Sequence, residues 1–73
     1  MEKKLRTLYR EMRSIGRQDE AGLILRLLQT GRVTLRMDDA SYNVETALQD
    51  LQLPILYNSD CTTATAYITG YAL

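Results

Sequence analysis

The chain has 73 residues, of which 45% are hydrophobic and 25% charged, and its nine basic and nine acidic side chains give a net charge of zero. This length predicts a single domain, and the composition is that of a globular protein rather than a disordered segment. The sequence has one cysteine and no histidine, which excludes an internal disulfide, Cys–His metal sites and histidine-dependent catalysis.

The sequence predicts a cytoplasmic protein without a membrane span. The charged N-terminus, residues 1–6, is not followed by the apolar core of a signal peptide. The most apolar stretch, residues 23–28, contains Arg26 and is too short to cross a bilayer. Cys61 fits a free thiol in a reducing compartment. We expect no metal and no cofactor.

The two halves of the chain carry opposite charge. Residues 1–37 hold nine positive and four negative side chains, a net charge of +5, whereas residues 38–73 hold five negative side chains and no positive one, a net charge of −5. Such a separation affects which partners are attracted and how they are oriented.

An amphipathic helix is predicted over residues 2–16. Its apolar positions recur at spacings of three and four, which places them on one stripe: Leu5, Leu8, Met12 and Ile15. Five basic residues follow the same spacing: Lys3, Arg6, Arg10, Arg13 and Arg17. At 100° per residue the centre of the basic stripe is about 160° from that of the apolar one. Gly16 is expected to end the helix.

A second helix is predicted over residues 20–29, with Asp19 as its N-cap. Apolar residues cover nearly its whole circumference: Ala21, Leu23, Ile24, Leu25, Leu27 and Leu28. Such a helix is either the central core helix or half of a dimer interface. We expect Leu23, Ile24, Leu27 and Leu28 to form the centre of the core, and Thr30-Gly31 to end the helix.

Two interpretations fit the next segment. Residues 32–37 alternate, so that Val33, Leu35 and Met37 share one face of a strand. Alternatively, only residues 32–34 are extended and Thr34 caps a short helix over 35–40. Residues 38–41 form a turn with capping side chains, followed by a helix over 42–52 with one apolar face.

The C-terminal part predicts a β-hairpin. Pro54 prevents the preceding helix from continuing, residues 55–57 form a short strand, and residues 58–60 form a turn. A long strand rich in Thr and Tyr follows over residues 63–73. The predicted fold class is small α+β, with N-terminal helices and a two- or three-stranded antiparallel sheet closed by this hairpin.

This order of elements resembles the winged helix-turn-helix domains of bacterial and phage regulators. The residues that carry the resemblance lie between about 20 and 73: Gly31-Arg32-Val33-Thr34, residues 44–51 (VETALQDL), residues 53–57 (LPILY) and Gly70-Tyr71-Ala72-Leu73. The resemblance implies a DNA-binding transcriptional regulator with helix 42–52 as recognition helix and residues 58–63 as wing tip. The apolar second helix and the opposite charges of the two halves predict a dimer. Three polar residues of that helix are candidate base readers: Asn43, Thr46 and Gln49. Candidate phosphate contacts are the five residues of the basic stripe together with Arg32 and Arg36.

An alternative hypothesis is a small phage-type inhibitor or adaptor that binds a host protein. No basic residue follows Arg36, whereas phosphate contacts need cations. Such a protein would bind through either the basic helix or the acidic half. Tyrosine is enriched at protein interfaces, so the candidate residues of the acidic half are Tyr57, Asp60, Tyr67 and Tyr71. We expect no enzymatic activity, because nucleophile elbows and Gly-rich phosphate loops are absent and Asp38-Asp39 fits helix capping better than acid–base chemistry.

Overall fold

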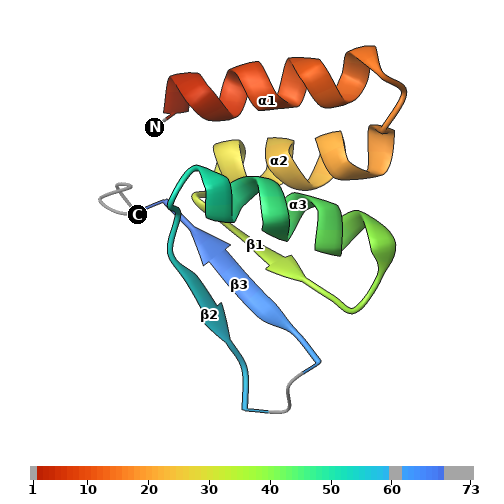
Figure 1. Cartoon of the computed structure of the whole chain (residues 1–73). Coiled ribbons are helices and arrows are strands. Elements are labelled where there is room, and N and C mark those ends of the chain that lie inside the picture. Colours follow the sequence, from red (N-terminus) through yellow and green to blue (C-terminus); the bar gives the residue numbers. More distant parts are fainter. Residues whose placement is uncertain (1, 60–61, 69–73) are drawn as a thin grey trace.

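The computed structural model describes residues 2–59 and 62–68, in which three helices and three strands are formed (Figure 1). In chain order the elements are α1 (Glu2–Ser14), α2 (Gln18–Thr30), β1 (Arg32–Leu35), α3 (Asp39–Asp50), β2 (Ile55–Tyr57) and β3 (Ala64–Tyr67). The predicted α+β fold class is confirmed.

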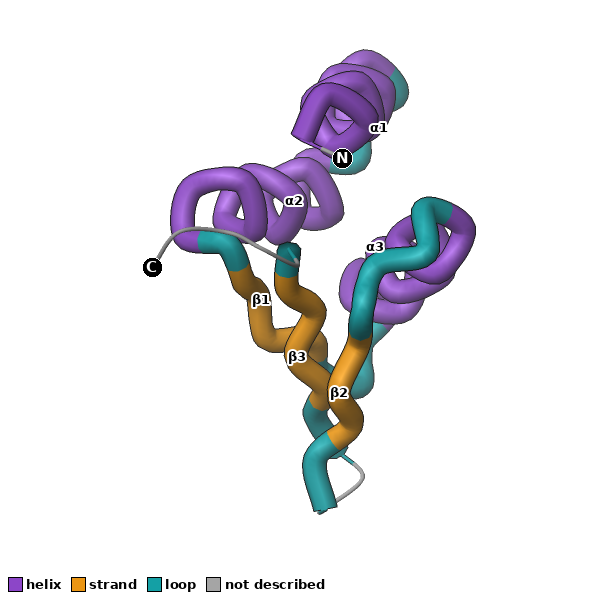
Figure 2. The backbone as a smooth tube through the Cα atoms, turned by 90° about the vertical axis from the view of Figure 1, so that its left-hand side faces the viewer, coloured by secondary structure: helices purple, strands orange, loops and turns teal. Residues whose placement is uncertain are grey.

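The strands form one antiparallel sheet in the order β1-β3-β2, so the last strand lies in the middle. The register pairs Val33 of β1 with Ala66 of β3, and Ala66 in turn with Ile55 of β2. The helices are gathered at one end of the sheet, with α2 between α1 and β1 and with α3 beside α2 (Figures 1 and 2). The β2–β3 hairpin extends away from α1.

The core lies where α2 meets α1, α3 and the sheet. Five large side chains have less than 2% of their surface exposed: Leu5, Ile24, Leu27, Val44 and Leu48. The predicted centre of the core is therefore confirmed for Ile24 and Leu27. It is wrong for Leu23 and Leu28, which are half-buried because they lie at the two edges of the covered face of α2.

The ends of α1 and α2 differ from the predicted ones. Helix α1 ends at Ser14, and Gly16 turns the chain at φ +80°. Ile15 therefore leaves the apolar stripe and is 63% exposed. Arg17 is the N-cap of α2 and makes no capping hydrogen bond through its side chain, so the assignment of Asp19 as N-cap is wrong. Asp19 lies in the first turn, where a carboxylate interacts favourably with the helix dipole.

The segment between β1 and α3 corrects both interpretations of residues 32–40. Strand β1 ends at Leu35, so Met37 is 79% exposed and does not share the buried face of Val33 and Leu35. A helix starting at residue 35 is also wrong. Asp38 is the N-cap of α3, and its side chain accepts a hydrogen bond of 2.7 Å from the Ser41 N–H. The predicted capping turn thus starts the helix three residues before residue 42.

The C-terminal hairpin is confirmed in part. Strand β2 has the predicted bounds, whereas β3 begins at Ala64. Residues 69–73, Asp60 and Cys61 lie outside the described residues. The strand order is compatible with a winged-helix layout, but the segment joining β1 to α3 is residues 36–38 alone, so one helix lies between β1 and β2. A helix-turn-helix places two helices in succession with a short turn between them.

Leu27→Ala is expected to lower the free energy of unfolding by about 2–5 kcal/mol, because Leu27 is fully buried and the cavity would be surrounded by three elements. Leu56→Ala is the matched control. Leu56 is 60% exposed, so its loss should change stability by no more than about 0.5 kcal/mol. Urea unfolding followed by circular dichroism measures both. Equal stability of the Leu27→Ala variant and the parent would contradict this description of the core.

Candidate macromolecule-binding surfaces

A groove runs between α1 and α2. It has a volume of about 610 Å³ and is lined by Glu2, Arg6, Tyr9, Arg10, Arg13, Leu25, Leu28 and Gln29. Leu25 and Leu28 are half-buried and form an apolar floor. Three arginines of α1 stand along the rim. We call this feature the arginine groove.

Two of the three rim arginines are held by neighbours on their own helix. The guanidinium of Arg13 lies 5.7 Å from the ring centroid of Tyr9 and donates a hydrogen bond of 3.4 Å to its hydroxyl. Arg6 pairs with the Glu2 carboxylate at 3.5 Å, an exposed contact that adds little stability. Arg10 has no ion pair with any residue that the structure describes. A partner carboxylate could therefore bind Arg10 without breaking an ion pair among the described residues.

The structure brings only part of the predicted cation set together. Lys3 and Arg17 are exposed but do not line the groove. Arg32 is exposed on β1, and Arg36 follows the end of that strand. Of the predicted cations, Arg6, Arg10 and Arg13 line the groove, whereas Lys3, Arg17, Arg32 and Arg36 do not.

Helix α3 is acidic. Asp39, Glu45 and Asp50 are the charged residues of this helix, which contains no Lys or Arg. Among the candidate base readers, Thr46 and Gln49 are exposed and Asn43 is half-buried. The Thr46 hydroxyl donates to the backbone carbonyl of Tyr42 at 3.0 Å, and the Gln49 amide donates to the Tyr57 hydroxyl at 3.2 Å. These two polar groups are already engaged within the chain.

Tyr57 links the hairpin to α3. Its hydroxyl donates a hydrogen bond to the Glu45 carboxylate, although Tyr57 as a whole is 62% exposed. This hydrogen bond, together with desolvation and the negative charge of Glu45, raises the pKa of Tyr57. Sequence reasoning missed this contact, because the partners are twelve residues apart. The sheet register explains the contact, because Tyr57 lies in the same row as Ala64 and Leu35, which face the helices.

The remaining tyrosines of the acidic half are dispersed. Tyr42 is 67% exposed on α3, and Tyr67 is half-buried opposite Arg32 in the sheet. Tyr71 and Asp60 lie outside the described residues. The two described residues of this set, Tyr57 and Tyr67, lie in rows that face opposite sides of the sheet, so they do not form one patch.

No protein-family model, curated protein or solved structure matches the chain. The described helices are too short and too polar to cross a membrane. Within residues 2–59 and 62–68, no three acidic or cysteine side chains cluster in a way that could hold a metal ion. The candidate function rests on the surfaces themselves.

The Tyr57–Glu45 contact predicts that the Tyr57 phenol ionises at a higher pH than an ordinary tyrosine. Tyrosinate absorbance during an alkaline titration would detect it as a late component, one that appears at the highest pH. Because the pKa of Tyr57 is higher in the folded than in the unfolded chain, its contribution to stability is present below the ordinary pKa of tyrosine and is lost as pH rises through the raised one. Tyr57→Phe should remove the late component, and Glu45→Gln should move it to lower pH. Tyr42→Phe is the control and should leave it unchanged. A late component that persists in Tyr57→Phe would refute the contact.

Proposed function

We propose that this protein is a small adaptor or inhibitor that binds an acidic surface of a partner protein through the arginine groove. The observation that carries this proposal is the combination of three rim arginines with an apolar floor formed by Leu25 and Leu28. Phosphate backbones need cations alone. The leucine side chains of the floor add binding free energy only when a partner buries apolar side chains against them.

The chemistry of the groove matches a peptide segment that is apolar on one side and acidic on the other. Arginine is favoured at protein interfaces, since its planar guanidinium can bind a carboxylate through two hydrogen bonds. Arg13 is stacked near Tyr9, so part of the rim is ordered before a partner arrives. Ordering in advance lowers the entropic cost of association.

DNA binding is the second candidate function. It is favoured by the six exposed cations from Lys3 to Arg17 and by the sheet order, which is compatible with a winged-helix-like regulator. In that case α1 would contact phosphates. The resemblance instead assigns base reading to α3, where Asp39, Glu45 and Asp50 would repel a phosphate backbone. Protein binding therefore stands first.

Dimerisation remains a prediction. Helix α2 packs against α1, α3 and β1 within one chain, so burial of its apolar residues does not need a second copy.

The two functions are separated by fluorescence anisotropy with random-sequence duplex DNA over a salt series. A phosphate-tracking α1 with about four contacts would give a slope of log K against log salt near −3.6. We expect instead no retention at about 50 mM salt, the low end at which phosphate binding is strong. Tight, salt-sensitive binding that Arg10→Ala and Arg13→Ala each weaken would establish the DNA function and contradict the proposal.

Capture from a bacterial lysate tests the protein-binding function. The partner retained by the parent should resist nuclease treatment and be lost with Arg10→Glu, since the substitution reverses the charge at the middle of the rim. Arg17→Glu makes the same charge change outside the groove lining and should retain the partner. Equal loss with both variants would show that net charge, not the groove, determines capture.

A further inference from the structure

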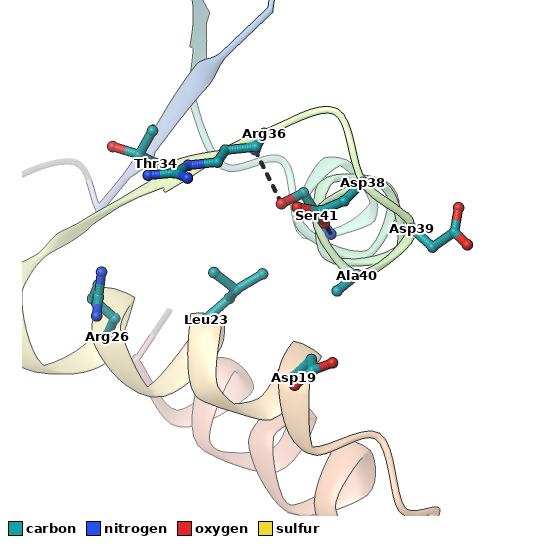
Figure 3. Close-up of a pocket in the computed structure, with 9 residues that line it drawn as sticks. All are labelled: Asp19, Leu23, Arg26, Thr34, Arg36, Asp38, Asp39, Ala40 and Ser41. Carbon is teal, nitrogen blue, oxygen red and sulfur yellow. Dashed lines mark hydrogen bonds between the residues drawn. The ribbon is translucent and has the colours of Figure 1, made fainter.

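A second site lies on the opposite flank of α2, along the outer edge of β1. A cleft of about 550 Å³ separates this edge from α2 and from the start of α3 (Figure 3). Its lining consists of Asp19, Leu23, Arg26, Thr34, Arg36 and residues 38–41. Figure 3 shows Leu23 and Arg26 rising from α2 toward β1, whereas the Asp39 carboxylate points away from the arginines.

The hydrogen-bond pattern of the sheet determines which backbone groups point into this cleft. The Ile68 N–H donates to the Gly31 carbonyl at 2.9 Å, in continuation of the β1–β3 register. Hydrogen-bonded pairs alternate along an antiparallel ladder, so residues 33 and 35 direct their backbone groups toward β3. Arg32 and Thr34 direct theirs toward the outer edge. On the other side of β3, the bond from the Tyr67 N–H to the Pro54 carbonyl follows the same alternation.

The chain itself closes both ends of this edge. The Thr30 hydroxyl lies 2.7 Å from the Arg32 carbonyl and 2.8 Å from the Arg26 carbonyl and shares its one proton between them. The Arg36 N–H donates to the Ser41 hydroxyl at 3.0 Å. Between them, the N–H and C=O of Thr34 have no backbone or side-chain partner among the residues that the structure describes. Thr34 is therefore the residue at this edge that offers both a donor and an acceptor to a partner strand.

We propose that the outer edge of β1 binds an extended acidic peptide by strand addition, with one peptide residue exchanging both backbone hydrogen bonds with Thr34. Strand addition derives affinity from main-chain hydrogen bonds and specificity from alternate side chains. This site is distinct from the arginine groove and does not rest on the function proposed for it.

The side chains beside Thr34 specify the acidic character of the peptide. Residues 32, 34 and 36 are exposed, and alternate side chains of a strand point to one face. The peptide residues two before and two after the partner of Thr34 then lie opposite Arg36 and Arg32 in an antiparallel addition. Carboxylates at those two positions form cross-strand pairs of opposite charge, which are favourable. Asp38 does not compete, because its carboxylate accepts from the Ser41 N–H.

A second copy of the chain is a poorer occupant of the edge. Antiparallel pairing of two β1 strands about Thr34 would place Arg32 of each copy opposite Arg36 of the other. Like charges directly opposite each other destabilise a strand pair. Self-pairing is therefore disfavoured by the same two residues that favour an acidic peptide.

The test uses an end-blocked peptide of sequence TEVTVET, with the full chain labelled for NMR. Binding should slow hydrogen exchange of the Thr34 amide and shift its signal. A peptide methylated at the nitrogen of its central threonine should bind at least about tenfold more weakly, because it lacks the donor to the Thr34 carbonyl. TQVTVQT should also bind more weakly, since it lacks both charges.

Protein variants locate the site. Arg36→Gln should weaken TEVTVET binding, because it removes a positive charge without placing a negative one near Asp39. Arg32→Gln should weaken binding by a similar factor. Arg10→Glu, in the arginine groove, should leave the affinity for TEVTVET unchanged. A failure of strand addition at β1 is thereby distinguished from a failure of the function proposed for the arginine groove. Equal affinity for the methylated peptide, or no change at Thr34 with millimolar TEVTVET, would overturn the proposal. So would protection of Thr34 that rises with protein concentration alone, because the occupant would then be a second copy.

Discussion

The burial of α2 is the constraint on which the rest of the structure depends. Its apolar residues extend around so much of the helix that no single neighbour can cover them, and Ile24 and Leu27 become fully buried only because α1, α3 and β1 pack on different sides. The cover is incomplete on both flanks. Leu25 and Leu28 remain at the arginine groove, and Leu23 remains at the β1 cleft. Both candidate binding surfaces therefore arise from apolar surface that a short chain leaves partly uncovered.

The charge separation along the sequence becomes a separation in space. Helix α1 lies on α2 at the end of the molecule away from the hairpin (Figure 1), and it carries five of the nine basic residues in its span Glu2–Ser14. The carboxylates of Asp39, Glu45 and Asp50 lie on α3. Tyr57 adds a neutral hydroxyl that partly masks Glu45. An anionic partner is consequently directed toward α1 and β1 rather than toward the helix that the sequence resemblance assigned to recognition.

Apolar periodicity predicted every helix, because burial of one face is a local property of the sequence, and Pro54 with the turn residues after Tyr57 predicted the hairpin. The ends were less predictable, since they depend on caps and turns. Ile15 and Met37 continue an apolar pattern, but Gly16 and the Asp38 cap end the elements before these residues reach the core. Contacts between elements were not predictable. The Tyr57–Glu45 bond and the free edge at Thr34 both follow from the order β1-β3-β2, which no periodicity within a single segment specifies.

The two surfaces lie on the same helix but do not overlap. Leu23 and Leu25 are about 200° apart around α2 at 100° per residue, so a partner in the arginine groove leaves the β1 edge accessible. One acidic partner long enough to contact both would reach the second site as an intramolecular event, at an effective concentration determined by the connecting segment. The contacts at the ends of the edge, at Thr30 and Ser41, leave Thr34 as the residue that offers both a donor and an acceptor. Such a site is too small to template extended strand aggregation, and its contribution to affinity is greatest when another contact already holds the partner.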